Sequence, residues 1–89
     1  MATVSFTPHL KRHVDCDSIN VDGVTIAEVL DSAFDAYDRL RGYVVDEQGR
    51  LRKHVVIFID GEPVKDRIHL TDAVANDAEV YVMQALSGG

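Results

Sequence analysis

The stretch TIAEVLDSAFDAYDRLRG, from Thr25 to Gly42, indicates the fold class, because its apolar side chains recur at the three- and four-residue spacing of one helix face. Thr25 and Glu28 have the spacing of a capping box at the start of a helix. Arg39, Arg41 and Gly42 are typical of a helix end. We therefore expect one amphipathic helix that packs against a flat apolar surface through Ile26, Val29, Leu30, Ala33, Phe34, Tyr37 and Leu40.

Acidic residues gather on the other side of this helix and in the chain as a whole. The expected ridge consists of Glu28, Asp31, Asp35 and Asp38. We interpret it as a solvated face, with docking to a basic partner as the alternative. The 89-residue chain carries 15 Asp and Glu against 9 Lys and Arg, a formal charge of -6. Such a charge repels a phosphate backbone and argues against nucleic-acid binding.

Two extended segments precede the helix. Residues 3–7 alternate, so that Val4 and Phe6 share one face and hydroxyl residues the other, which predicts a half-buried strand. A weaker extended stretch runs from about His13 to Val21 and ends at a turn. We expect the only two prolines, Pro8 and Pro63, to lie at strand edges or turns.

Further strands follow the helix. Residues 43–45 are strand-like, and residues 54–59 form an apolar strand that closes at Asp60-Gly61. An Asp-Gly pair between extended runs predicts a hairpin in which both residues have positive φ. A short arm follows at residues 62–64, then a polar, irregular segment at residues 65–78. The last strand, residues 79–86, has apolar side chains on both of its faces, which is typical of a strand in the middle of a sheet.

This order of elements predicts an α+β sheet with its helix on one face. Alternation then divides the strands into two sets of side chains. Facing the helix we expect Val4, Phe6, Val55, Ile57, Ile59, Val80 and Val82. On the uncovered face we expect Val56, Phe58, Tyr81 and Met83. An uncovered apolar patch on a small domain indicates a partner surface, although Lys and Arg stems are an alternative cover.

Side-chain catalysis finds no support in the sequence. It lacks HExxH, CxxC, GxSxG and glycine-rich phosphate motifs, and its four histidines are scattered, which predicts no metal site. Asp15 and Asp17 flank Cys16 and disfavour its thiolate. A single cysteine fits a reducing, cytoplasmic setting, and no stretch is long and apolar enough to span a membrane.

The reactive group that remains is the α-carboxylate of Gly89, which follows Ser87 and Gly88. Glycines at both positions let a backbone enter a channel that any Cβ would block, and they leave the carbonyl carbon open to attack. We therefore expect a folded domain over residues 1–86 and a flexible Ser-Gly-Gly tail over residues 87–89 that serves as a substrate handle.

The chain resembles the ubiquitin-like sulfur-carrier family of MoaD, ThiS and CysO. The resemblance is carried by the order of strands and helix, by Asp60-Gly61-Glu62 after an apolar strand, by the segment 40–44, and by the last strand running into Ser87-Gly88-Gly89. It covers essentially the whole chain and implies a ubiquitin-like β-grasp fold with a mixed sheet. One departure is the turn at residues 76–79, which reads Asn-Asp-Ala-Glu where the family often has Asp-Gly-Asp-Glu.

The resemblance implies a carrier rather than an enzyme. A MoeB/ThiF-like adenylating enzyme would use ATP to activate the Gly89 carboxylate, a sulfur donor (a desulfurase, rhodanese or sulfide) would convert it to a thiocarboxylate, and a synthase would accept the sulfur. This chain would bind no cofactor itself. Gly88 and Ser87 would give access to the tail. The docking surface would consist of Val56, Phe58, Tyr81, Met83 and Leu86.

Three interpretations remain at this point. The chain is a sulfur carrier for molybdopterin, thiamine, cysteine or another sulfur metabolite, including as a subunit of a molybdopterin synthase. Alternatively it is a protein modifier that joins lysines through Gly89, or a β-grasp scaffold with an inert tail. The sequence does not separate the first two, because both need the same tail.

Overall fold

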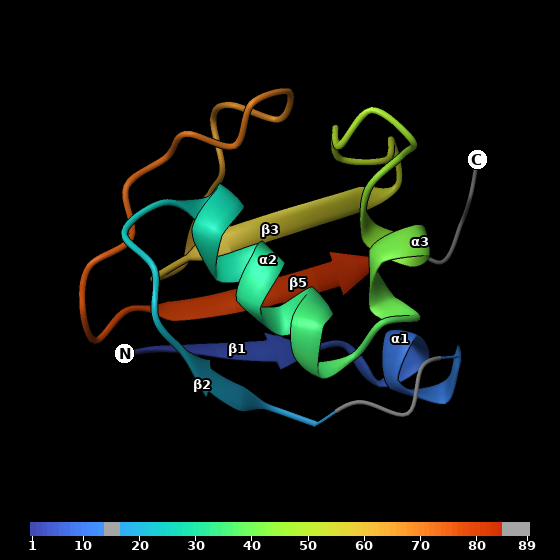
Figure 1. Cartoon of the computed structure of the whole chain (residues 1–89), viewed down its shortest axis with the longest axis horizontal. Coiled ribbons are helices and arrows are strands. Elements are labelled where there is room, and N and C mark those ends of the chain that lie inside the picture. The colour runs from blue at the N-terminus through green and yellow to red at the C-terminus, as the bar shows by residue number, and fades with distance from the viewer. Residues whose placement is uncertain (14–16, 85–89) are drawn as a thin grey trace.

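A single mixed sheet with α2 lying across one face forms the molecule (Figure 1). The structure is a computed structural model that describes residues 1–13 and 17–84. Along the chain the elements are β1 (Ala2–Phe6), α1 (Pro8–His13), β2 (Ile19–Val21), α2 (Ile26–Ala36), α3 (Leu40–Val44), β3 (Val55–Ile59), β4 (Glu62–Pro63) and β5 (Glu79–Gln84). The strand order is β2-β1-β5-β3-β4. The predicted α+β class is therefore confirmed.

Strand β5 lies in the middle of the sheet, as its two apolar parities predict. It runs parallel to β1, with Phe6 beside Val82, and antiparallel to β3, with Phe58 beside Tyr81. The described part of β5 ends at Gln84. Ala85 and Leu86, which were predicted to belong to this strand, lie outside the described residues. The two neighbouring strands pair with the backbone of β5 on both edges.

The Asp60-Gly61 hairpin is confirmed in its conformation. Asp60 has φ 50° and Gly61 has φ 86°, the two positive values that the pair predicts. The turn is also bound to β5, because the Asp60 amide donates to the Glu79 carbonyl at 2.8 Å and the Glu79 amide donates to the Asp60 carboxylate at 2.9 Å. This reciprocal pair fixes where β5 begins relative to the hairpin.

Helix α2 packs on the sheet through the predicted stripe. Ile26, Val29 and Ala33 are fully buried, as are Val4 and Val82 on the strands beneath. The capping box forms in a shifted version: the Glu28 amide donates to the Thr25 hydroxyl at 3.3 Å, whereas the Glu28 carboxylate accepts from the amide of Val24 rather than that of Thr25. The apolar core thus lies between α2 and one face of the sheet.

The predicted single long helix is wrong after Ala36. Tyr37 leaves helical geometry at φ -133° and ψ 86°, and its ring packs edge-to-face against Phe6 at 6.5 Å between centroids. The chain then re-enters helix α3, which contains Tyr43 and Val44, so the predicted strand at residues 43–45 is wrong too. The break lets Leu40 and Val44 turn into the core, where both are fully buried.

A second helix was not predicted. Residues 8–13 form α1, whereas the sequence indicated an extended stretch from His13, and β2 is confined to three residues. The missed signal is Thr7-Pro8, since Pro is preorganised for the first position of a helix. Pro8 therefore begins a helix rather than a strand edge. Leu10 anchors α1 in the core with 1% of its surface exposed.

The segment after β4 is irregular, as predicted, but two aspartates organise it. Asp72 accepts backbone hydrogen bonds from Lys65 at 3.0 Å and Asp66 at 2.8 Å. Asp66 in turn accepts from two backbone amides and, at 2.6 Å, from the Thr71 hydroxyl. The carbonyls of Leu70 and Asp72 then accept from the first-turn amides of α2 at 3.0 Å, so this loop caps the helix.

Acid is expected to destabilise the fold through these aspartates. The Thr71 hydroxyl and the backbone amides of residues 68, 69 and 71 lower the pKa of Asp66 from 3.8 to about 2. A lowered folded-state pKa contributes stability in full above about pH 4, and this contribution is lost as the pH falls towards 2. We expect the melting temperature, followed by circular dichroism, to drop across this interval.

Two substitutions test the assignment. Asp66→Asn should lower the melting temperature at pH 6 and weaken the drop between pH 4 and pH 2, while a residual drop remains because the backbone amides of Arg50 and Lys65 also lower the pKa values of Asp46 and Asp72. Asp77→Asn, at an exposed turn position, should leave the profile unchanged. A wild-type melting temperature that is constant from pH 5 to pH 2 would contradict the prediction.

Candidate functional site

The face of the sheet opposite α2 carries an apolar patch. It consists of Val56 and Phe58 on β3 and Tyr81 and Met83 on β5, hereafter the sheet patch. Phe58 lies directly beside Tyr81, and Val56 directly beside Met83. Met83 is 36% exposed and the other three are half-buried. The predicted division of side chains between the two faces is therefore confirmed.

The remainder of this face is polar. Thr3 and Ser5 of β1 point the same way as the sheet patch, and they bond to neighbours on the β2 side. The Thr3 hydroxyl donates to the Asn20 side chain at 2.7 Å, and the Ser18 hydroxyl donates to that of Ser5 at 3.1 Å. The face thus has an apolar half over β3 and β5 and a hydroxyl half over β1 and β2.

A hollow of about 400 Å³ lies on this face, towards the Asp60-Gly61 hairpin. Phe58 and Tyr81 form its apolar wall, Ser5 borders the hydroxyl half, and Gly61 and Glu79 close the end near the hairpin. A side chain from a partner protein fits such a depression better than it fits a flat strand surface. Aromatic residues in a small depression are also the residues that contribute most to binding at protein interfaces.

The expected reactive end follows β5 directly. Leu86, Ser87, Gly88 and Gly89 lie outside the described residues, so their predicted roles remain predictions. The structure does place Gln84, the last described residue, beside Val55 at one end of the sheet. Five further residues reach at most about 18 Å from that point. A partner that holds Gly89 is therefore close enough to contact the sheet patch.

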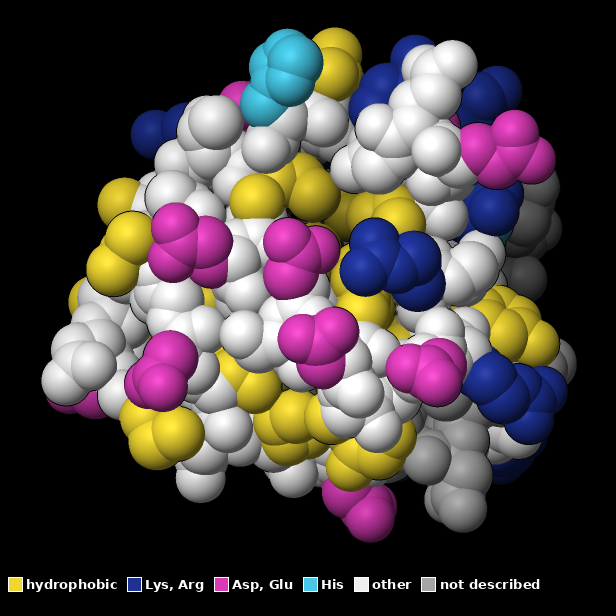
Figure 2. All heavy atoms as spheres, viewed as in Figure 1, with side chains coloured by type: hydrophobic (Ala, Val, Ile, Leu, Met, Phe, Trp, Pro, Cys, Tyr) yellow, Lys and Arg dark blue, Asp and Glu magenta, His cyan; other side chains and the backbone are white. Residues whose placement is uncertain are grey.

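The opposite face of the molecule has a different character. Acidic side chains gather over the face that α2 presents (Figure 2), and Glu28, Asp31, Asp35 and Asp38 are all exposed, as predicted. Arg41 lies over the Phe34 ring at 4.7 Å and approaches Asp31 at 3.9 Å. An exposed pair of this kind contributes little to stability. The ridge remains largely anionic and solvated.

Metal-binding and membrane-spanning features are absent from residues 1–13 and 17–84. No group of three His, Cys, Asp or Glu residues in this part is arranged to hold a metal ion. Cys16 lies outside it. No helix within the same residues is long and apolar enough to cross a bilayer.

Known proteins share both the sequence pattern and the fold. The family model described as "ThiS family" matches residues 11–89. No curated protein sequence matches the chain. A chain of the BexX/CysO complex from Amycolatopsis orientalis superposes with a TM-score of 0.84, 22% identity and full coverage of both chains. CysO from Mycobacterium tuberculosis gives 0.81 and 25% identity, covering 97% of this chain and 100% of its own.

A third similar structure is SAMP1 from Haloferax volcanii. It has a TM-score of 0.80 and 24% identity, and the superposition covers 99% of this chain and 98% of that one. Likeness at this level of identity shows a shared fold. The expected ubiquitin-like β-grasp architecture is therefore confirmed.

Proposed function

Because this chain belongs to the ThiS family, we propose that it is a sulfur carrier whose Gly89 carboxylate is converted to a thiocarboxylate. The observation that carries the proposal is the family match, which extends through Ser87, Gly88 and Gly89. The fold supports it, because the central strand β5 leads directly towards these residues.

The chemistry takes place on the carboxylate and is performed by partner enzymes. In the first step a Gly89 carboxylate oxygen attacks the α-phosphate of ATP on a MoeB/ThiF-like enzyme, which forms a mixed anhydride with AMP and releases pyrophosphate. In the second step a sulfide equivalent from a donor enzyme attacks the carbonyl carbon, and AMP leaves with the electron pair of the broken bond. The product thiocarboxylate then gives its sulfur to an accepting synthase.

The described residues contribute recognition. The sheet patch supplies apolar contact area for the partners, with Leu86 as its proposed extension towards the tail. The hydroxyl half of the face disfavours a partner docked in the reverse orientation. Apolar groups of the partner would then cover the hydroxyl groups of Thr3 and Ser5, and burying polar groups against apolar ones costs free energy. The chain in this proposal is a substrate that is presented, and neither ATP nor a metal is held by its own residues.

The intact mass of the chain from its native host tests the proposal. A population that carries the increment for one oxygen exchanged for sulfur is expected under reducing conditions, and deletion of Gly89 should abolish it. If wild-type chain supplied with ATP, a sulfur source and activating enzymes stays unmodified, the carrier function is wrong.

Protein modification through Gly89 is the second candidate. Small archaeal modifier protein 1 from Haloferax volcanii and Urm1 from Sulfolobus solfataricus share this fold. Both functions begin with the same activated carboxylate, but only a modifier forms isopeptide bonds to lysines. High-mass conjugates that persist on a denaturing gel, and that disappear with Gly89, would assign the second function. A tail deletion without any effect would favour the inert scaffold.

A further inference from the structure

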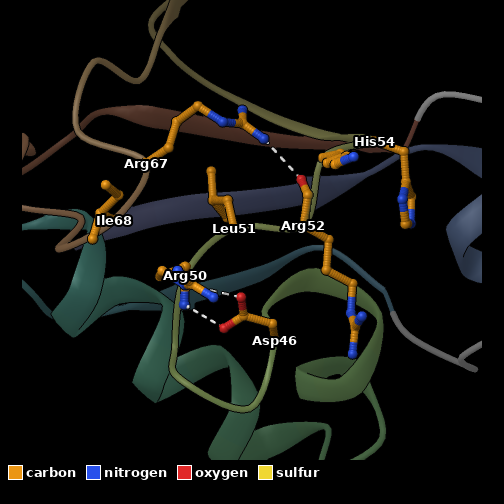
Figure 3. Close-up of a pocket in the computed structure, with 8 residues that line it drawn as sticks. Asp46, Arg50, Leu51, Arg52, His54, Arg67 and Ile68 are labelled. Carbon is orange, nitrogen blue, oxygen red and sulfur yellow. Dashed lines mark hydrogen bonds and ion pairs between the residues drawn. The ribbon is translucent and has the colours of Figure 1, made fainter.

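A basic hollow lies on this acidic molecule, at the edge formed by residues 46–54 and the loop at Arg67 (Figure 3). It has a volume of about 580 Å³. Four of the nine Lys and Arg residues of the chain line it, although the formal charge of the whole chain is -6. They are Arg50, Arg52, Lys53 and Arg67. Positive charge is therefore concentrated at one place.

Two of the three arginines of the basic hollow, Arg52 and Arg67, are held by neutral carbonyl groups. Arg52 donates through Nε to the Gly42 carbonyl at 2.8 Å, and Arg67 donates to the Arg52 carbonyl at 2.8 Å, as Figure 3 shows for the second contact. A carbonyl orients a guanidinium without cancelling its charge. The hollow thus presents the guanidinium groups of Arg52 and Arg67 in defined orientations.

Within the described part of the chain, only one of the four cations, Arg50, is paired with an acidic side chain. The one carboxylate in the lining, Asp46, accepts from the Arg50 side chain at 3.1 Å and from the Arg50 amide at 3.0 Å. Among residues 1–13 and 17–84, Arg52, Lys53 and Arg67 form no ion pair with a carboxylate. Three positive charges are therefore available to a ligand.

The hollow also has apolar surface. Leu51 forms its floor with 7% exposure, and Ile68 stands at its rim with 58% exposure. Free phosphate has no group that matches this apolar surface, and none of the lining residues has an aromatic ring on which a nucleic-acid base would stack, apart from the imidazole of His54. A peptide segment with carboxylates on either side of an apolar side chain matches both parts of the hollow: its carboxylates match the cations, and its apolar side chain matches Leu51 and Ile68.

The location of the hollow indicates which protein supplies that segment. Lys53 and His54 immediately precede Val55, which pairs with Gln84 at the end of β5. We propose that the basic hollow binds an acidic segment of the enzyme that acts on the Gly89 carboxylate. This inference rests on the proposed function for the identity of the enzyme, but not for the binding of an acidic segment.

Binding is tested with full-length ¹⁵N-labelled chain and a short peptide in which glutamates flank a leucine. The peptide should shift the amides of residues 51–53 and 67–68, more strongly at low ionic strength than at physiological ionic strength. A matched peptide with glutamines should not. Lys53→Glu should raise the dissociation constant about fivefold, because one attractive contact becomes repulsive. Lys65→Glu, an equal charge change at an exposed site near β4, should leave it unchanged.

Several outcomes would overturn the inference. Equal binding of the glutamine peptide, or shifts elsewhere on the surface, would exclude an acidic ligand at this place. Inorganic triphosphate that shifts the same amides more strongly than the peptide would assign the hollow to a small anion. A dimer in sedimentation experiments that dissociates in Lys53→Glu would assign it to a second copy of this chain, whose α2 ridge is acidic.

The link to the enzyme has its own readout, the thiocarboxylate fraction in the native host. Lys53→Glu should reduce this fraction about fivefold relative to Lys65→Glu. A normal fraction in Lys53→Glu, with peptide binding lost, overturns the link and leaves the carrier function intact. Absence of thiocarboxylate in wild-type chain overturns the carrier function, and the peptide titration still decides whether the hollow binds acidic segments.

Discussion

Ile57→Asp is expected to leave the chain unfolded at neutral pH, whereas Phe58→Asp, at the next residue of β3, is expected to fold. Ile57 is fully buried beneath α2. Losing its side chain costs about 2 to 5 kcal/mol, and the unpaired carboxylate adds a further desolvation penalty. A domain of this length has a total stability of about 4 to 13 kcal/mol, so the core substitution removes most or all of it.

Phe58→Asp acts on the other face. The side chain is half-buried and its main contact across the strands is Tyr81, so the loss is about 1 kcal/mol. The effect on partner binding is larger, because an aromatic residue that lines a hollow is typical of an interface hot spot worth about 2 to 4 kcal/mol. We expect about a hundredfold weaker binding to the activating enzyme.

Circular dichroism and calorimetry measure the folding part of this prediction, and the dissociation constant for the activating enzyme measures the rest. Val24→Asp is the matched control, because it also replaces an apolar side chain by a carboxylate, at a position that is 65% exposed and outside the sheet patch and the hydroxyl half of that face. Unfolding of Phe58→Asp would show that the parity of β3 is misassigned. Unchanged binding in a folded variant would remove the sheet patch from the docking surface.

The parity of the strands and the hairpin were predictable from sequence because each depends on neighbours in the chain. Alternation alone separates Ile57 from Phe58, and Asp60-Gly61 has few conformations other than the one observed. The helix break was not predictable in this way. Tyr37 continues the apolar spacing of α2, yet it leaves helical geometry and its ring packs against Phe6, a contact between distant residues that local spacing does not encode.

The basic hollow was hidden from the sequence for a similar reason. Arg52 and Arg67 are separated by a strand, a hairpin and part of a loop, and they meet because the Leu51 amide donates to the Arg67 carbonyl at 3.0 Å and the Arg67 side chain donates back to the Arg52 carbonyl. The net charge of a whole chain does not reveal a local cluster of positive side chains. A chain with formal charge -6 therefore carries a site suited to acidic ligands.

Gly88→Val is expected to abolish thiocarboxylate formation, by more than about a hundredfold, without changing the stability of the domain. Glycine at this position leaves a narrow path for the backbone, and a β-branched side chain both widens the chain and disfavours the conformations that only Gly adopts freely. Positioning errors of about 1 Å near a reacting group cost on the order of a hundredfold in rate.

A graded series makes the test specific to the width of the tail. Gly88→Ala should retain an intermediate thiocarboxylate fraction by intact mass, Gly88→Val should retain none, and Ser87→Gly should behave as wild type because it narrows the chain. All three variants should have the melting temperature of the wild-type protein, because the substituted positions lie beyond Gln84, where β5 as described ends. If Gly88→Val is converted as readily as wild type, the tail does not enter a narrow channel, and glycine at this position needs a different explanation from access to the activating enzyme.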